Sequence, residues 1–159
     1  MTVREAKFTD IPKIVGLALG AHERSIYKGT EVQVDIQHMK RLLMTIIQRH
    51  GGKGENATCV LVSERDGVVE GCMIAVALRI QMVCDKLEVM DLFFYQSPRS
   101  MPADARRLLQ GVVNWAKGMK NVVQITIGTT DSIEGYQRVE RLYRRTGFRR
   151  AGAIYGMKV

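Results

Sequence analysis

The sequence predicts an α/β domain, and three observations support that fold class. The 159 residues fit a single domain, which we place over residues 1–159. Hydrophobic residues make up 46% and charged residues 25%, as in ordinary globular proteins, so disordered and collagen-like classes are excluded. Runs with strand character alternate with segments of helical period along the whole chain.

The first third of the chain predicts a strand followed by two helices. Residues 2–8 alternate and predict a short strand. The sequence TDIP at 9–12 predicts a helix start, because cap-type side chains precede a proline that suits the first turn. Asp35 is expected to open a second amphipathic helix, which the glycine cluster at 51–54 ends.

The middle of the chain predicts three strands. Residues 57–64 and 68–80 are expected to pair through a hairpin turn at 65–67. Gly71 within the second strand indicates a bulge or a close approach by another backbone. Residues 87–95 are apolar on both faces, which predicts a central strand.

The last third predicts helix, strand, helix and strand. A helix is expected over 102–117 and a buried strand over 122–127. The sequence DSIE at 131–134 resembles a capping box and predicts the start of the last helix, which Gly147 ends. Residues 148–158 are expected to close the domain as a strand.

Several classes of protein are not indicated. The first residues do not resemble a secretory signal, and no apolar run reaches the ~18 residues of a membrane span, so we expect a cytoplasmic protein with no membrane partner. Cys59, Cys72 and Cys84 are interpreted as small buried hydrophobic residues. The three histidines lack ligand spacing, so no metal site is expected.

The chain is basic, with a net charge of +8 and a pI near 9.7. Such an excess attracts phosphorylated cofactors, nucleic acid or acidic partners, or serves only solubility. No aromatic residues are interleaved with the basic ones, so a nucleic-acid platform is not indicated. The excess is concentrated near the end of the chain, in Arg138, Arg141, Arg144, Arg145, Arg149 and Arg150.

The segment from Leu142 to Phe148, with Tyr143 and Gly147, resembles the L-Y-x-x-x-G-F ending of the GNAT superfamily of acyl-CoA-dependent N-acetyltransferases. The order of predicted elements is similar to that family over nearly the whole chain. The resemblance implies a mixed, mostly antiparallel sheet with a splayed central strand and flanking helices. It also implies acetyl-CoA as co-substrate, beside residues 87–95, and no divalent metal.

The resemblance further assigns contacts to the co-substrate. Backbone groups near Phe93, Phe94 and Tyr95 would pair with the pantetheine arm like an added strand. The pyrophosphate would meet the amino end of the following helix, where free N–H groups and the helix dipole favour anions.

Tyr143 is the candidate general acid, because a phenol can protonate the CoA thiolate that leaves when acetyl moves to an amine. The alternative is a structural role, in which Tyr143 is an amphipathic aromatic residue at a helix end. Glu88 and Asp91 are candidates for the carboxylate that receives the amine proton. Being three apart in a strand, they face opposite sides, with Asp91 on the face of Phe93 and Tyr95. Glu88 is then expected to share a face with Met90 and Phe94, and a paired or edge-exposed carboxylate is the alternative for each.

The phosphate-binding segment departs from the family's Q/R-x-x-G-x-G/A pattern. Ser100 stands at the polar position, and Ala103 and Ala105 stand at the two glycine positions. Pro102 supplies no N–H donor, and Asp104 adds a negative charge where a pyrophosphate would lie.

Two accounts fit this departure. In the first, Asp104 stabilises the helix dipole and Arg99, Arg106 and Arg107 contact phosphate. In the second, the cofactor site has decayed and the fold serves another purpose. Tyr136, where the family often carries asparagine, is a second departure.

The resemblance therefore predicts a transferase that moves acetyl from acetyl-CoA directly to a primary amine. The alternative is a non-catalytic module with this fold. The acceptor is a small or macromolecular amine, for which Glu31 and Asp35 in the loop 27–35 offer carboxylates. The oligomeric state is left open between monomer and homodimer.

Overall fold

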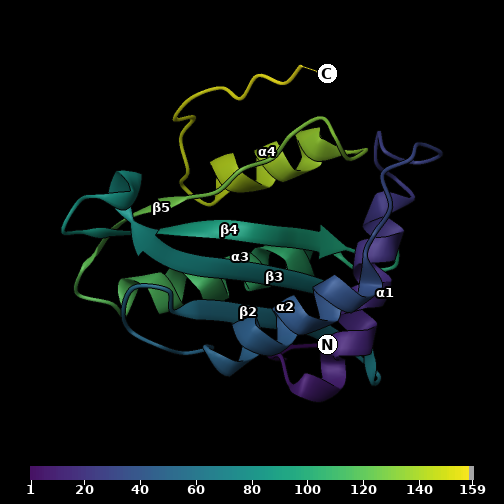
Figure 1. Cartoon of the computed structure of the whole chain (residues 1–159), viewed down its shortest axis with the longest axis horizontal. Helices are drawn as coiled ribbons and strands as arrows, with labels where there is room; N and C mark the ends of the chain where they lie inside the picture. Colours follow the sequence, from purple (N-terminus) through teal and green to yellow (C-terminus); the bar gives the residue numbers. More distant parts are fainter. Residues whose placement is uncertain (158–159) are drawn as a thin grey trace.

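A computed structural model describes residues 1–157 and contains a five-stranded sheet (Figure 1). The strands lie in the order of the sequence, and neighbours are antiparallel except for the last two, which are parallel. The predicted mixed, mostly antiparallel sheet is therefore confirmed. The strands are β1 (Thr2–Glu5), β2 (Thr58–Arg65), β3 (Val68–Arg79), β4 (Leu87–Gln96) and β5 (Val122–Thr126).

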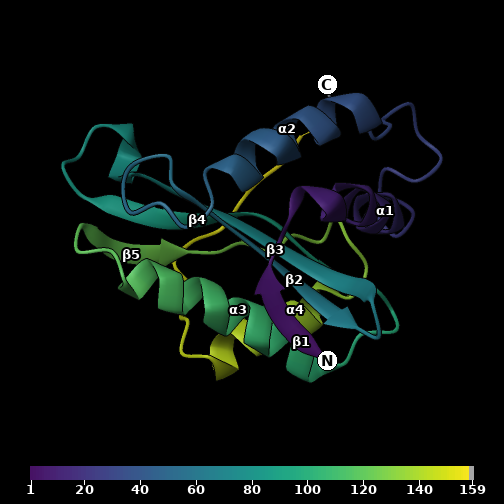
Figure 2. The same cartoon turned by 90° about the horizontal axis from the view of Figure 1, so that it is seen from below.

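Helices cover both faces of the sheet, two on each (Figures 1 and 2). The first two pack with alternate side chains of β2, β3 and β4, and the last two pack on the opposite face. Within residues 1–157, no helix is long and apolar enough to cross a membrane. The helices are α1 (Ile11–His22), α2 (Ile36–Gln48), α3 (Pro102–Lys117) and α4 (Tyr136–Arg145), with short 3-10 turns η1 (Phe8–Asp10) and η2 (Ile80–Met82).

The predicted starts of the first three helices are confirmed. The first helix follows Asp10 and has Pro12 in its first turn. Asp35 caps α2, because its carboxylate accepts the backbone N–H of His38 at 2.8 Å. The bounds of α3 coincide with the predicted 102–117.

The β2–β3 hairpin also forms as predicted. Asp66 and Gly67 make a two-residue turn in which both residues have positive φ, as a type I′ turn requires. The bulge predicted at Gly71 is confirmed, whereas the atoms that approach Gly71 closely belong to the side chains of Ser63 and Gln96 and not to another backbone. Glu70 is the extra residue of a bulge, since Gly71 pairs with Ser63 and Val69 pairs with Glu64. A Cβ on Gly71 would lie only 2.7 Å from Ser63 Oγ.

The central position predicted for residues 87–95 is confirmed, because β4 lies inside the sheet between β3 and β5. The prediction for β5 needs correction. Residues 122–127 were expected to be buried. Instead β5 is an edge strand, and Val123 is 62% exposed.

The predicted capping box at 131–134 is wrong. The last helix begins at Tyr136, after Gly135 in the left-handed region with φ 86°, and no side chain caps it. Backbone groups of the predicted box instead bond to the segment that follows α1: the Ile26 N–H donates to the Ser132 carbonyl, and the Glu134 N–H donates to the Arg24 carbonyl. Tertiary pairing thus overrides the local signal.

The predicted closing strand is also wrong over residues 148–157, which form no strand; Lys158 lies outside the described residues. These residues turn away over α4 and have no strand neighbour (Figure 1). The end of α4 is as predicted. Gly147 has φ 95°, and the Phe148 N–H donates to the Tyr143 carbonyl at 3.0 Å, which is typical of a glycine C′ cap.

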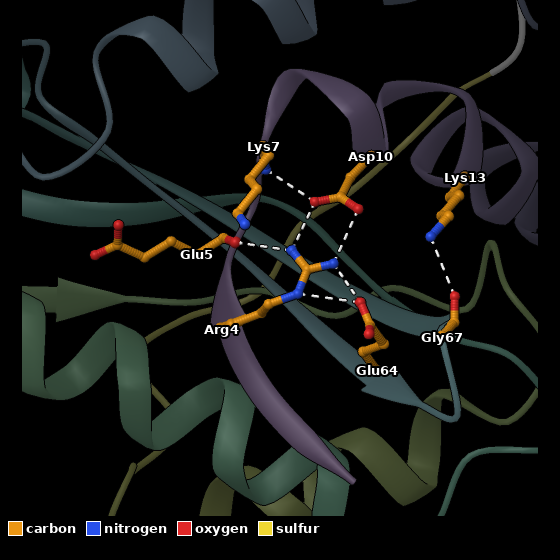
Figure 3. Close-up of polar contacts among 7 residues, drawn as sticks. All are labelled: Arg4, Glu5, Lys7, Asp10, Lys13, Glu64 and Gly67. Carbon is orange, nitrogen blue, oxygen red and sulfur yellow. Dashed lines mark hydrogen bonds and ion pairs between the residues drawn. The ribbon is translucent and has the colours of Figure 1, made fainter.

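A buried polar network fixes the start of the chain (Figure 3). The Arg4 guanidinium donates to both carboxylate oxygens of Asp10, at 2.7 and 3.0 Å, and also binds Glu64 on β2. Asp10 is 2% exposed and accepts the Lys7 N–H at 2.8 Å. The network therefore joins β1, β2 and the turn before α1.

Candidate active site

The candidate site lies where β4 and β5 separate. The two strands pair from Leu87 to Met90 only, and beyond that point β4 continues to Gln96 with β3 as its strand neighbour. The Gly128 N–H, just after β5, donates to the Asp91 carboxylate at 2.9 Å. The β5-side edge of residues 91–96 is thus left without a strand partner among the described residues.

A bulge at Leu92 changes which side chains share a face. Asp91 pairs with Ala75 and Phe93 pairs with Ile74, so Leu92 is the extra residue. Asp91 therefore lies on the face of Phe94, and the prediction that it shares a face with Phe93 and Tyr95 is wrong. A regular strand was assumed, and alternation fails across a bulge.

Glu88 lies on the other face from Asp91, as their spacing predicted. Glu88 pairs with Leu78 and Met90 pairs with Val76, and these two partners lie on the same face of β3. Glu88 shares a face with Met90 as expected, but the bulge places Phe94 on the opposite face. The Thr126 hydroxyl donates to Glu88 Oε2 at 2.9 Å, so Glu88 is a paired carboxylate directed away from Tyr143.

Tyr143 reaches the same point from α4. Its side chain is buried, and its hydroxyl donates to the Gly128 carbonyl at 3.1 Å. The Phe94 ring stacks on it, with centroids 6.4 Å apart and an angle of 22° between the planes. One peptide residue, Gly128, therefore connects the two candidate catalytic side chains, with its N–H on Asp91 and its carbonyl on Tyr143.

Burial shifts the pKa values of Tyr143 and Asp91 in the same direction, upward. Burial raises the pKa of the Tyr143 phenol, and the charge of Asp91 raises it further. Burial also raises the pKa of Asp91, while the hydrogen bond from Gly128 opposes that shift. A raised pKa makes Asp91 a better base, whereas it makes the phenol a poorer match for a thiolate than the free side chain is.

The amino end of α3 departs from the predicted phosphate site in one respect. The Asp104 side chain is turned inward and is 1% exposed. Its carboxylate accepts the Met101 N–H at 3.2 Å and pairs with Arg65 at 3.3 Å. These contacts support the account in which Asp104 stabilises the start of α3, because its carboxylate binds the backbone of that first turn and is paired with Arg65.

The other predicted phosphate-contact residues surround this end of α3. Arg99, Ala103 and Arg106 are exposed and Ala105 is partly exposed. The Ser100 hydroxyl donates to the Ser97 carbonyl at 2.8 Å and lies 3.1 Å from Gln96 Oε1, so it holds the loop. Their roles toward a cofactor stay predictions.

Four buried polar atoms without hydrogen-bond partners lie around the nearby bulge in β3, and sequence reasoning missed them. They belong to Ser63, Arg65, Glu70 and Gln96, and the Arg65 and Glu70 atoms form an ion pair with each other at 3.6 Å. Gly71 was the sequence signal that pointed here, since it is the residue that Ser63 and Gln96 approach. Buried polar groups are usually paired, so this junction is less saturated than an ordinary core.

The residues fit acetyl-CoA unevenly. The open edge of β4 suits the amide groups of a pantetheine arm, which bind as an added strand does. The amino end of α3 offers fewer donors than a glycine loop, because Pro102 has no N–H and the Met101 and Asp104 N–H groups are already bonded. No cluster of three or more metal-binding side chains is found in residues 1–157.

Comparisons with solved structures identify the fold. A ribosomal-protein-alanine N-acetyltransferase from Brucella melitensis matches with a TM-score of 0.71 and 22% sequence identity. The match covers 96% of this chain and 86% of the Brucella chain. A predicted acetyltransferase with acetyl-CoA from Clostridium acetobutylicum matches over 99% and 95%, with a TM-score of 0.70 and 16% identity. A transcriptional regulator from Bacillus halodurans reaches 0.72 at 14% identity over 99% of both chains.

The chain therefore has the GNAT acetyltransferase fold over its full length. No protein-family model matches the sequence, and no curated protein matches it. At these identities the likeness establishes the fold and leaves the activity to be argued from the site.

Proposed function

We propose that this protein is an acyl-CoA-dependent N-acetyltransferase that moves acetyl from acetyl-CoA directly to a primary amine. The observation that carries the proposal is the arrangement of Asp91, Gly128 and Tyr143 where β4 and β5 part. In this fold it supplies a carboxylate base and a phenol donor at one point.

The proposed reaction uses each group once. The amine nitrogen forms a bond to the acetyl carbon, and the carbon–sulfur bond breaks. Asp91, directly or through water, takes the proton that the amine loses, and its raised pKa favours that transfer. Tyr143 donates its hydroxyl proton toward the leaving sulfur, giving up its bond to the Gly128 carbonyl.

In this proposal, the residues predicted to contact the cofactor bind acetyl-CoA. Backbone groups of Phe93, Phe94 and Tyr95 would hold the pantetheine arm, and Arg99 and Arg106 would supply charge for the phosphates. Asp35 already caps α2, so Glu31 is the freer carboxylate for a cationic acceptor.

Release of CoA thiol in the presence of a panel of primary amines tests the proposal. Tyr143→Phe is expected to lower the rate of transfer by about 10- to 100-fold, since it removes the proton donor. Tyr155→Phe is the control, because Tyr155 is 93% exposed and should leave the rate unchanged. Equal rates for Tyr143→Phe and wild type would remove Tyr143 from the reaction.

A second candidate function is a non-catalytic binding module. The bonded donors and Pro102 at the start of α3 favour it, as does the raised pKa of Tyr143. It predicts no transfer to any amine and no binding of acetyl-CoA.

A further inference from the structure

The exposed side of α4 carries a row of arginines that the proposed reaction does not use. Arg138, Arg141 and Arg145 are spaced i, i+3 and i+7, so they lie on one face of the helix, and all three are exposed. We call these three residues the α4 arginine face. They extend over about 10 Å of the helix axis.

Helix stability does not account for this face. Cations near the carboxyl end of a helix interact favourably with its dipole, which explains Arg145. Arg138 lies in the first turn, where the dipole disfavours a cation. Like charges three or four residues apart also repel one another, so Arg141 adds a further cost.

The surroundings do not neutralise the face either. Residues 135–150 contain six arginines and one glutamate, so this segment carries a net charge of +5, whereas the whole chain carries +8. Across the described part of the chain, no carboxylate pairs with any of these six arginines. A cleft of about 450 Å³ adjoins the face and adds Arg24, whose partner is Glu134 at 3.6 Å.

The chemistry of the surface favours phosphate over a protein partner. None of the exposed large apolar side chains belongs to α4, so the arginine face itself offers a protein no apolar anchor. Arginine binds phosphate oxygens in pairs through its planar guanidinium. One strand of a duplex carries a phosphate every ~3.4 Å of axis, so the face spans about three.

We propose that the α4 arginine face binds the phosphate backbone of double-stranded nucleic acid without reading its sequence. Aromatic residues are not interleaved with these arginines, but aromatic residues serve to stack single-stranded bases and are not needed for duplex phosphates. The proposal is independent of the acetyltransferase activity, since a catalytically inactive protein would bind equally well.

Fluorescence anisotropy with a labelled 20-base-pair DNA duplex, between 50 and 200 mM salt, tests the proposal. The triple variant R138Q/R141Q/R145Q is expected to bind at least about 10-fold more weakly, and the slope of log K against log salt should fall by about 2 to 3. R41Q/R49Q/K53Q is the matched control, because it removes the same charge from exposed positions in α2 and the loop after it, and α2 packs on the opposite face of the sheet from α4 (Figure 2). It should weaken binding less than about threefold.

Four results would overturn the proposal. They are no duplex binding by the wild type at 50 mM salt, unchanged binding by the triple variant, an equal loss in the control, and equal or tighter binding of a poly-glutamate peptide. Calorimetry with acetyl-CoA on the triple variant separates this proposal from the enzymatic one. Unchanged acetyl-CoA affinity is expected, and a parallel loss would assign the arginines to the cofactor phosphates instead.

Discussion

Two junctions where a strand leads into a helix both use a buried aspartate paired with an arginine, but the hydrogen bonds are complete at only one of them. At the first, between β1 and α1, Asp10 accepts the N–H of Lys7 and two hydrogen bonds from Arg4, which also binds Glu64 (Figure 3). The Arg4 bonds hold the pKa of the Asp10 carboxyl below its usual range. Every polar group of this junction has a partner.

At the second, between β4 and α3, Asp104 is as deeply buried and likewise accepts an N–H three residues before it, from Met101. Its arginine, Arg65, makes one contact of 3.3 Å with Asp104 and a looser ion pair of 3.6 Å with Glu70, and it is a third exposed. Beside it, Ser63 Oγ and Gln96 Nε2 are buried without a hydrogen-bond partner among the described residues.

The difference separates scaffold from candidate site. The first junction is saturated and holds the sheet to α1, so it has no group left to bind anything. The second stands at the end of β4, where the proposed acetyl-CoA site would hold the pyrophosphate, and it retains polar groups that water or a ligand can satisfy. Substitutions at the two junctions should therefore differ in size and in what they affect.

Asp10→Asn should have the largest effect. It leaves the guanidinium of Arg4 with part of its buried charge uncompensated, and we expect a loss of about 3 kcal/mol in the free energy of unfolding. Urea denaturation at pH 7 measures it. Asp85→Asn is the control, because Asp85 is 87% exposed and contacts only Lys86, at 3.9 Å. A loss below about 1 kcal/mol would show that the network is not a structural clamp.

The same pair predicts a pH dependence. Because the pKa of Asp10 is lower folded than its unfolded value of 3.8, its contribution is complete above that value. It is lost as the pH falls through the lowered pKa, when the folded protein takes up the proton. The stability gap between wild type and Asp10→Asn should therefore shrink below about pH 4, and a constant gap would contradict the assignment.

Gly71→Ala should have an intermediate effect. Its Cβ would lie 2.7 Å from Ser63 Oγ and 3.0 Å from Gln96 Cγ, so these side chains must move within a buried bulge. We expect a loss of about 2 kcal/mol by thermal or urea unfolding. Gly152→Ala, whose Cβ would meet nothing within 4 Å, should be neutral. A neutral Gly71→Ala would mean that the second junction is looser than its contacts indicate.

Asp104→Asn should have the smallest effect on stability. The amide oxygen still accepts from Met101, and Arg65 is partly solvated, so about 1 kcal/mol is expected. Its affinity for acetyl-CoA should stay within about threefold of wild type, because the carboxylate is turned inward. A gain of 10-fold or more would instead show that Asp104 repels the pyrophosphate.

The sequence predicted the order of elements well where local signals and packing agree. The α3 bounds, the turn at Asp66–Gly67 and the cap at Gly147 all rest on residues whose backbone preference matches their place in the fold. The predictions that failed depend on partners distant in sequence. The box at 131–134 pairs with the end of α1, and the strand at 148–158 has no neighbouring strand over its described residues.

The candidate site was predictable in its residue types and less so in its geometry. The L-Y-x-x-x-G-F ending located Tyr143, and the spacing of Glu88 and Asp91 correctly separated their faces. The bulge at Leu92 could not be read from the sequence, because the extra residue carries no local signature. Gly128, which joins Asp91 to Tyr143 through its backbone, was missed for the same reason.

Isothermal titration of acetyl-CoA into the protein tests the central claim most directly, because the proposed transfer requires the partly open junction at β4 and α3 to bind this molecule. The account predicts saturable one-site binding with a Kd below about 1 mM, in the range of ordinary enzyme substrates. No heat of binding up to millimolar acetyl-CoA would contradict it and leave the fold serving a non-catalytic role.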